Sequence, residues 1–137
     1  INALSVRQKG LDTFVRAAAA LPSTRFVLIG RHSDAAAVAS LRRMAPPNVE
    51  FPGTVRAEDL QQYYARARVY AQLSAHEGFG LAAAEARAAG CRVVATDRGS
   101  LPEVLGAAAS YVPFGDVTGA VEAIAGEETV GRGAGDA

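Results

Sequence analysis

The amino-acid sequence predicts an α/β fold: a single Rossmann-like domain of three layers, built around a parallel sheet of about six strands. Short apolar runs rich in β-branched residues alternate with Ala-rich stretches of helical periodicity, and only a few residues connect them. Alternation of this kind gives a parallel sheet with helices on both faces. The strand-like runs are apolar on both sides, as a doubly covered sheet requires.

The first third of the chain contains two predicted strands and two predicted helices. Ile1–Val6 is predicted as an opening strand, and Lys9–Ala20 has apolar side chains at helical spacing. Arg25–Gly30 is an apolar run that ends in glycine, which is typical of a buried strand entering a turn. Asp34 is a suitable N-cap for a helix that continues to about Met44.

The middle of the chain continues the alternation. Asn48–Phe51 is a brief predicted strand, and the turn residues Pro52 and Gly53 follow it. Glu58–Arg66 is predicted as a helix and Val69–Leu73 as a strand.

The last third contains three predicted helices and two predicted strands. A glycine loop precedes the helix Leu81–Ala89, and the β-branched run Arg92–Ala95 forms the next strand. The remaining predicted elements are a short helix at Leu101–Leu105, a strand at Ser110–Val112 and a helix at Val117–Ala125.

Length and composition indicate one globular domain. The chain has 137 residues, of which 50% are hydrophobic and 20% are charged, and this balance excludes a disordered chain. We expect the domain to comprise residues 1–125. The polar, glycine-rich stretch 126–137 is predicted as a flexible or truncated tail.

Charge and cysteine content exclude several classes of protein. Fourteen basic residues balance fourteen acidic ones, so no long-range field attracts nucleic acid. No apolar run reaches the roughly 18 residues that a transmembrane helix needs, and the first residues do not resemble a signal peptide. The single cysteine, Cys91, excludes an intrachain disulfide and fits a cytoplasmic protein.

The segment Ser74–Gly90 carries the clearest signal for ligand binding. Ligands of open parallel sheets bind beyond the carboxyl ends of the strands, and here a glycine loop joins such an end to a helix. Amides without an internal acceptor are expected at four successive residues: Gly78, Phe79, Gly80 and Leu81. Together with the positive end of the helix dipole, these amides predict a site for phosphate or for sugar oxygens.

Two glutamates flank this predicted anion site. Glu77 lies just before the glycines, and Glu85 lies about one turn into the helix, where a carboxylate can accept both hydroxyls of a vicinal diol. A structural interpretation stays open beside this one. Glu85 also suits the helix dipole or an ion pair with Arg87 or Arg92, and a glycine loop after a strand is often only a turn.

Lys9 is the only lysine among the fourteen basic residues. In a chain whose other cations are all arginine, a single lysine suggests a compact point charge that the wide guanidinium fork cannot replace. Lys9 is therefore a candidate functional cation.

Several segments together resemble the group 1 (family 4) retaining glycosyltransferases. Glu77 and Glu85 form an E-x7-E arrangement, and the residues after it, 84–104, are similar to the donor-site signature of that family. The similarity extends to 9–21, 25–34 and 48–60, in the family's order. The resemblance implies the C-terminal, nucleotide-sugar-binding half of a GT-B architecture, whose N-terminal domain binds the acceptor.

The resemblance also implies roles for single residues. Glu85 is expected to bind the ribose hydroxyls and Glu77 to contact the donor sugar, while the backbone of Gly78–Leu81 contacts sugar and phosphate. Lys9 is expected to bind the diphosphate and to stabilise the leaving group, since a cation placed at developing negative charge lowers the barrier. The turn from Gly53 to Val55 borders the nucleobase.

Further donor-binding candidates are Gly30, Ser74 and His76, the last of which contacts the donor sugar or is an ordinary loop residue. The family usually has an arginine five residues before the lysine, where this chain has Leu4. Arg7 either replaces that arginine through a shifted loop or is a surface charge.

No metal or cofactor is expected beyond the nucleotide-diphosphate sugar, which is the donor substrate. The chain has no Asp-x-Asp pair, and the sequence around His76 lacks the second histidine of a zinc-binding HExxH motif.

The leading hypothesis is thus a glycosyltransferase domain that binds a donor for hexosyl transfer but does not catalyse alone, because the acceptor domain must enclose the site. We expect the full-length enzyme to be cytoplasmic or peripheral at the inner face of the membrane. The alternative is a non-catalytic doubly wound module that binds a phosphorylated ligand or a partner protein.

Overall fold

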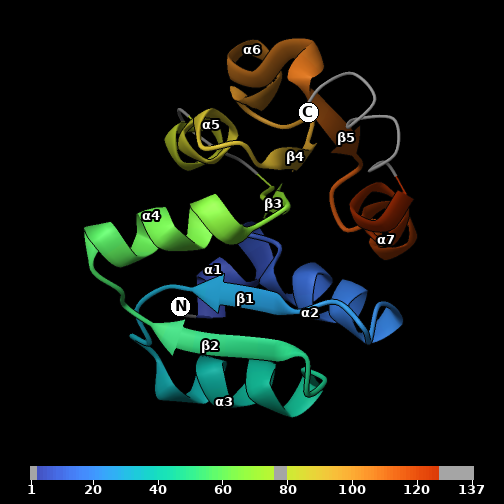
Figure 1. Ribbon diagram of the computed structural model, residues 1–137. Coiled ribbons are helices and arrows are strands. Elements are labelled where there is room, and N and C mark those ends of the chain that lie inside the picture. Colours follow the sequence, from blue (N-terminus) through green and yellow to red (C-terminus); the bar gives the residue numbers. More distant parts are fainter. Residues whose placement is uncertain (1–2, 76–79, 127–137) are drawn as a thin grey trace.

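The computed structural model describes residues 3–75 and 80–126, which form an α/β arrangement of parallel strands and covering helices (Figure 1). The described strands are β1 (Phe26–Ile29), β2 (Val49–Gly53), β3 (Val69–Gln72), β4 (Arg92–Thr96) and β5 (Ala109–Val112). The described helices are α1 (Ala3–Gln8), α2 (Leu11–Ala20), α3 (Ala35–Met44), α4 (Ala57–Arg66), α5 (Leu81–Ala88), α6 (Leu101–Leu105), the 3-10 helix η1 (Gly106–Ala108) and α7 (Val117–Gly126).

All strand pairs are parallel, as predicted, but the strands form two sheets. β1 pairs with β2, and β3, β4 and β5 form a second sheet in that order. The prediction of about six strands in one sheet is therefore wrong in two respects: the structure has five strands within the described residues, and β1 and β3 are not hydrogen-bonded to each other.

The predicted opening strand accounts for the difference in strand number. Its described part, from Ala3, belongs to α1, and only residues 1–2 lie outside the described chain. Alanine, leucine, arginine and glutamine have high helix propensity. A helix also satisfies its backbone groups internally, whereas a strand needs a neighbour.

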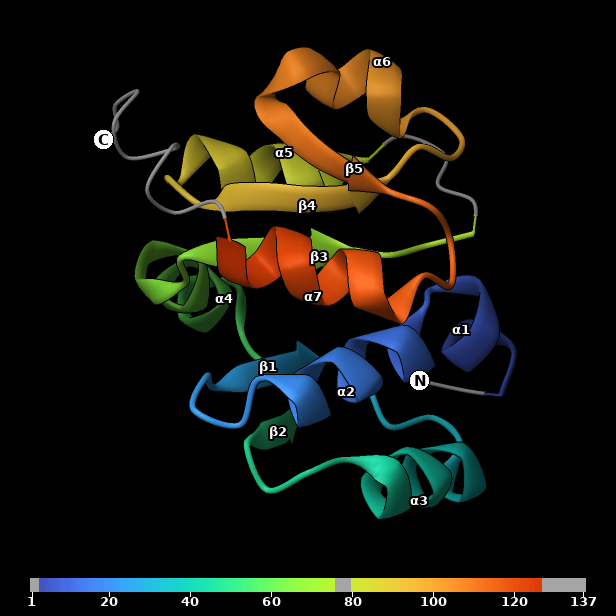
Figure 2. The same cartoon turned by 90° about the vertical axis from the view of Figure 1, so that its right-hand side faces the viewer.

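Helices cover both faces of the larger sheet, which confirms the three-layer prediction for this part of the chain. On one face, Val93 and Ala95 of β4 pack with Leu101 and with residues of α5. On the other face, Val94 packs with residues of α2 and α7. Figure 2 shows α7 lying in front of β3 and above α2, and Figure 1 shows it to the side of the strands. The apolar character of β4 on both sides follows from this double cover.

An open groove of about 870 Å³ separates β1 from β3. Its walls are the facing strands and the end of α4, with Val27 and Ile29 on one side and Val69 and Ala71 on the other. The apolar cluster that includes Phe26, Leu73 and Val112 spans the two sheets. The contact between α2 and α7 also connects them.

Most helix boundaries follow the sequence signals. Asp34 is confirmed as the N-cap of α3, since its Oδ1 accepts hydrogen bonds from the amides of Ala36 (3.0 Å) and Ala37 (3.1 Å). The predicted helix Lys9–Ala20 begins two residues later, because Gly10 adopts a left-handed conformation as the N-cap of α2. No helix of the described chain combines the length and the apolar character needed to cross a bilayer.

Candidate functional site

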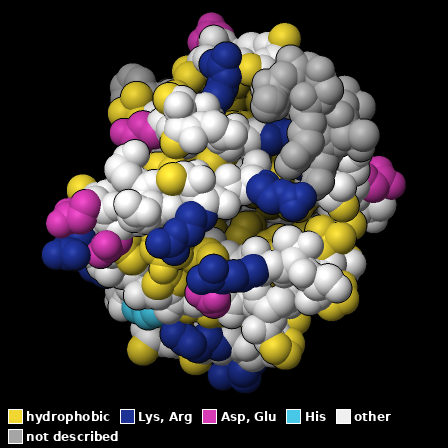
Figure 3. All heavy atoms as spheres, in the orientation of Figure 1, with side chains coloured by type: hydrophobic (Ala, Val, Ile, Leu, Met, Phe, Trp, Pro, Cys, Tyr) yellow, Lys and Arg dark blue, Asp and Glu magenta, His cyan; other side chains and the backbone are white. Residues whose placement is uncertain are grey.

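The groove between the sheets brings several predicted site residues together at the carboxyl ends of β1 and β3. Lys9, Gly30 and Ala82 of α5 all line it. Four basic residues line the groove as a whole, namely Lys9, Arg25, Arg66 and Arg68, and no acidic residue of the described chain does so. Figure 3 shows basic side chains gathered across the middle of this face. Arg25 forms an ion pair with Glu50, and Arg25, Arg66 and Arg68 precede β1 and β3. Lys9 is the basic residue of this lining near the carboxyl ends of the strands, where the sequence predicts an anionic ligand.

Gly10 fixes the position of Lys9 against the end of β3. The backbone of Gly10 is left-handed (φ 67°, ψ 29°), and a Cβ there would lie 2.8 Å from the carbonyl carbon of Leu73 and closer still to its oxygen. On the same side, the amide of Ala75 donates a 2.6 Å hydrogen bond to the carbonyl of Gln8. The exposed Lys9 side chain therefore starts from a backbone that is packed directly on β3.

Gly53 and Val55 are not among the described residues that line the groove, but Gly53 lies at the end of β2 beside Gly30, which does line it. The amide of Gly30 donates to the carbonyl of Gly53 over 3.1 Å. Gly53 is buried with φ 80°, and a Cβ there would lie 3.8 Å from the imidazole of His32. Val55, two residues farther, is half-buried. Gly30 and Gly53 thus lie together, as their predicted role in one ligand site requires.

The N-terminus of α5 is exposed toward solvent through Leu81, whose side chain is 68% exposed. Gly80 precedes it in a left-handed conformation (φ 66°, ψ 29°) as the N-cap, and no side chain caps the helix. The predicted helix Leu81–Ala89 is confirmed with an end at Ala88. Four predicted site residues lie outside the described chain: His76, Glu77, Gly78 and Phe79.

Glu85 has an exposed side chain on α5, and buried Ala83 and Ala86 face the core. It is close enough to Tyr64, which lines the groove, to affect its ionisation: burial raises the pKa of Tyr64, and the charge of Glu85 adds to that rise. Arg92, which the sequence offered as an ion-pair partner of Glu85, donates to the carbonyls of Ala123 (2.7 Å) and Ile124 (2.8 Å).

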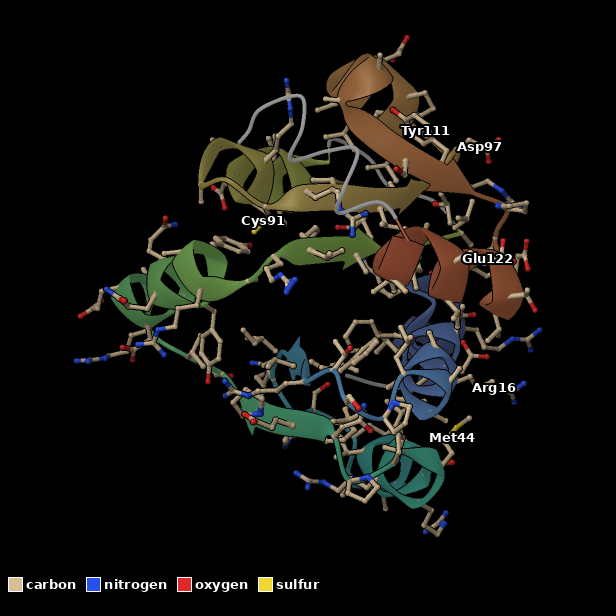
Figure 4. The ribbon with its side chains drawn as sticks, turned by 45° about the vertical axis from the view of Figure 1, so that its right-hand side comes forward. Arg16, Met44, Cys91, Asp97, Tyr111 and Glu122 are labelled. Carbon is tan, nitrogen blue, oxygen red and sulfur yellow. The ribbon has the colours of Figure 1, made fainter. Side chains whose placement is uncertain are left out.

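Cys91 packs beneath Tyr64, between α4 and α5 (Figure 4). Its thiol donates to the carbonyl of Tyr64 at 3.2 Å, and burial raises the pKa of Cys91. This cysteine therefore has a structural role beneath the groove.

Arg7 is not brought into the groove. It lines a separate hollow of about 190 Å³ together with Asp12, Arg16, Phe114 and Val117. Arg7 belongs to the last turn of α1, and the helical periodicity sets the side of the helix on which it lies. Its predicted contact with a diphosphate bound near Lys9 has no support in this arrangement.

Ser74 was a donor-binding candidate in the sequence, but sequence reasoning missed the chain of buried polar side chains to which it belongs. Ser74 is fully buried, and its Oγ accepts a 2.8 Å hydrogen bond from Nε2 of Gln72. The hydroxyl of Thr96 donates to the carbonyl of Ser74 over 2.6 Å, and Tyr70 donates to Oε1 of Gln72 over 2.7 Å. The available signal was a glutamine inside the otherwise apolar run of Val69–Leu73.

Comparison with known proteins identifies the family to which these features belong. Residues 1–126 match the model of the family described as "Glycosyl transferases group 1". The gpi3 subunit of the phosphatidylinositol N-acetylglucosaminyltransferase of Schizosaccharomyces pombe is 32% identical over 103 residues, which cover 71% of this chain and 23% of that protein. The lipopolysaccharide core mannosyltransferase LpcC of Rhizobium leguminosarum is 31% identical, with coverage of 86% and 37%. The chain thus spans well under half the length of these relatives.

Solved structures show the same relation in three dimensions. The sucrose-phosphate synthase of Thermosynechococcus elongatus superposes with a TM-score of 0.76 at 30% identity, over 86% of this chain and 32% of that one. HepE of Anabaena, solved in complex with UDP and glucose, gives a TM-score of 0.76 at 26% identity, over 84% and 34%.

Proposed function

The chain belongs to the group 1 glycosyl transferases, and on that premise we propose that it binds the donor of a retaining enzyme, which transfers a hexosyl group from a nucleotide-diphosphate sugar. It corresponds to the C-terminal half of a GT-B architecture, and the acceptor site belongs to an N-terminal domain of the full-length enzyme. The chain covers 23% and 37% of the lengths of the two relatives named above, which is consistent with one part of a larger enzyme.

One observation carries the proposal: the groove at the carboxyl ends of β1 and β3 joins Lys9, the glycine turn at Gly30 and the first turn of α5. These are the positions that binding of a diphosphate requires, namely a cation, a backbone that permits close approach, and a helix N-terminus. The solved relative that holds UDP and glucose supports this choice of ligand.

Each residue then has a distinct task. Glu85, exposed on α5, accepts the ribose hydroxyls, and Glu77 contacts the sugar. During transfer the bond between the anomeric carbon and the diphosphate oxygen breaks, and its electron pair remains on that oxygen. Lys9 stabilises this negative charge, which makes the diphosphate a better leaving group. Val55 and the turn at Gly53 border the nucleobase.

The test is a titration of this chain, with amide chemical shifts as the readout and UDP, UDP-glucose, GDP and GDP-mannose as ligands. We expect shifts at Lys9, Gly80, Leu81 and Glu85, with millimolar affinity because the enclosing domain is absent. Glu85→Gln should weaken the binding of every nucleotide. Glu122→Gln is the matched control, since Glu122 is an exposed glutamate on α7, away from the groove (Figure 4). An absence of shifts at these residues in millimolar ligand would refute the proposal.

The alternative, a non-catalytic module for a phosphorylated ligand, makes a different prediction for the same titration. It expects inorganic pyrophosphate to produce the same shifts as the nucleotides, with no further effect of base or sugar. The donor-binding proposal expects UDP-glucose or GDP-mannose to shift additional amides beyond those shifted by the corresponding diphosphate.

A further inference from the structure

Ser74 and Ala75, the last described residues before the segment that leads to α5, are held by several separate parts of the chain. The hydroxyl of Thr96, at the end of β4, donates to the carbonyl of Ser74 (2.6 Å). The guanidinium of Arg98 donates to the carbonyl of Ala75 (3.4 Å), and the amide of Ala75 donates to the carbonyl of Gln8 (2.6 Å).

The Thr96 contact extends the connection between β3 and β4 beyond their ladder. The parallel register ends with Gln72 opposite Ala95. Ser74 lies two residues past that pair, and both its side chain and that of Thr96 are fully buried. A hydroxyl without solvent access around it has few alternative partners, so this hydrogen bond fixes where the chain leaves β3.

Gln72 adds a second restraint from within β3. Its Nε2 donates to the Ser74 hydroxyl over 2.8 Å, while Tyr70 donates to its Oε1 over 2.7 Å. Each end of the glutamine amide is thereby oriented. The buried serine is held through its hydroxyl by Gln72 and through its carbonyl by Thr96.

Ala75 also connects the end of β3 to the segment that carries Lys9. Ala75 contacts Gln8, which immediately precedes Lys9, and Ala75 itself is two residues before Glu77 in the sequence. A shift of Ser74 and Ala75 would therefore move the end of β3 relative to the backbone that carries Lys9. Transfer chemistry is sensitive to such displacements, because misplacement by about 1 Å can cost about 100-fold in rate.

We propose that Thr96 and Gln72 are positioning residues for donor binding, which act through Ser74 and Ala75 to hold the end of β3 in register with Lys9. The inference rests on the proposed donor site. Neither side chain needs to touch the donor, and the effect of each is transmitted through the backbone at Ser74 and Ala75.

The experiment measures the dissociation constants of UDP and UDP-glucose for this chain and for Thr96→Val, which keeps the shape but removes the hydroxyl. We expect the affinity for UDP-glucose to fall about tenfold, which corresponds to about 1.4 kcal/mol, and the affinity for UDP to fall less. Thr96→Ser should restore both. Thr118→Val is the matched control, because Thr118 is an exposed threonine on α7.

A second variant separates positioning from loss of stability. Val94→Ala removes buried apolar volume from β4 without removing a polar contact to Ser74. It should lower the melting temperature but leave the ratio of the two dissociation constants unchanged. If Thr96→Val does not fold, Gln72→Met is measured in its place, and the same decrease in the UDP-glucose affinity is expected.

The outcomes are distinguishable. If the wild-type chain binds neither UDP nor UDP-glucose, the proposed function itself fails. If the wild type binds both, and a folded Thr96→Val or Gln72→Met variant binds them with unchanged constants, the positioning role is overturned. The positioning role would also be overturned if Val94→Ala changed the ratio of the two dissociation constants as much as Thr96→Val does. The effect would then follow from a general loss of stability.

Discussion

Gly10 and Gly80 allow the cost of a backbone clash to be measured separately from the cost of a left-handed conformation. The two glycines have nearly the same backbone angles, φ 67° and ψ 29° at Gly10 and φ 66° and ψ 29° at Gly80. They differ in what an added methyl group would meet. At Gly80 the nearest atom is Cδ2 of Leu101, 3.1 Å away, and a leucine side chain can adjust. At Gly10 the methyl would meet the backbone of Leu73.

The structure gives the expected magnitudes. Alanine in the left-handed region costs about 1 kcal/mol at either position. At Gly10 the chain must also move away from β3, which adds about 1–3 kcal/mol of strain and repacking. That movement pulls on the hydrogen bond between Ala75 and Gln8, whose loss costs about 1 kcal/mol. We therefore expect Gly10→Ala to lower the free energy of unfolding by about 3–5 kcal/mol and Gly80→Ala by about 1–2 kcal/mol.

Urea denaturation of the two variants and the wild type, followed by circular dichroism, measures both differences. The reasoning is refuted if Gly10→Ala destabilises the chain no more than Gly80→Ala. That result would mean that the backbone of Leu73 yields as easily as the side chain of Leu101.

Three further predictions concern stability. Asn48→Ala should lower the free energy of unfolding, measured by urea denaturation, by about 2–3 kcal/mol. The Asn48 amide donates to the carbonyls of Ala18, Leu21 and Thr24, at and just after the end of α2, and the variant loses these bonds. Asn48→Asp should not restore the stability, because a carboxylate cannot donate these hydrogen bonds. Asp34→Ala should cost about 1 kcal/mol through loss of the α3 N-cap, and Asp34→Ser should recover most of that loss. Burial raises the pKa of Cys91, so the unfolded thiol ionises first and stability should fall as the pH rises above about 8.5. Cys91→Ala should reduce that slope, and an unchanged slope would contradict the assignment to this thiol.

The elements that the sequence predicted correctly are those whose signals are local. Asp34 can cap α3 because the cap bonds span only two and three residues. The continuous apolar run of β4, which lacks the alternation of a half-exposed strand, predicted burial on both faces from local sequence alone. The opening strand at Ile1–Val6 could not be judged in this way, since a hexapeptide with four apolar and two polar residues fits a strand or a helix, and only the packing of its neighbours decides.

The arrangement of the site depends on long-range packing, which one sequence does not report. The sequence predicted that Lys9 and Gly30 each follow a strand, which is right for Gly30 and wrong for Lys9, which follows α1. That the two residues line one groove depends on how β1 and β3 lie. The position of Arg7 in a different hollow depends on the rotation of α1. The polar chain of Gln72, Ser74 and Thr96 joins two strands more than twenty residues apart, so its partners could not be paired in advance.

The separation of the two sheets has a consequence for how the domain opens. No ladder hydrogen bond of the described chain joins β1 to β3, so the β1–β2 pair can unfold without breaking the β3–β4–β5 ladder. Beside the hydrogen bond between Ala75 and Gln8, what couples the two units is apolar contact, which includes Phe26 against the cluster with Leu73 and Ile124 and the packing of α2 on α7. Apolar contact weakens on cooling, unlike a ladder of hydrogen bonds. Amide exchange in β1 and β2 should therefore become faster relative to exchange in β4 as the temperature falls, which makes the smaller sheet the cold-sensitive half of the molecule.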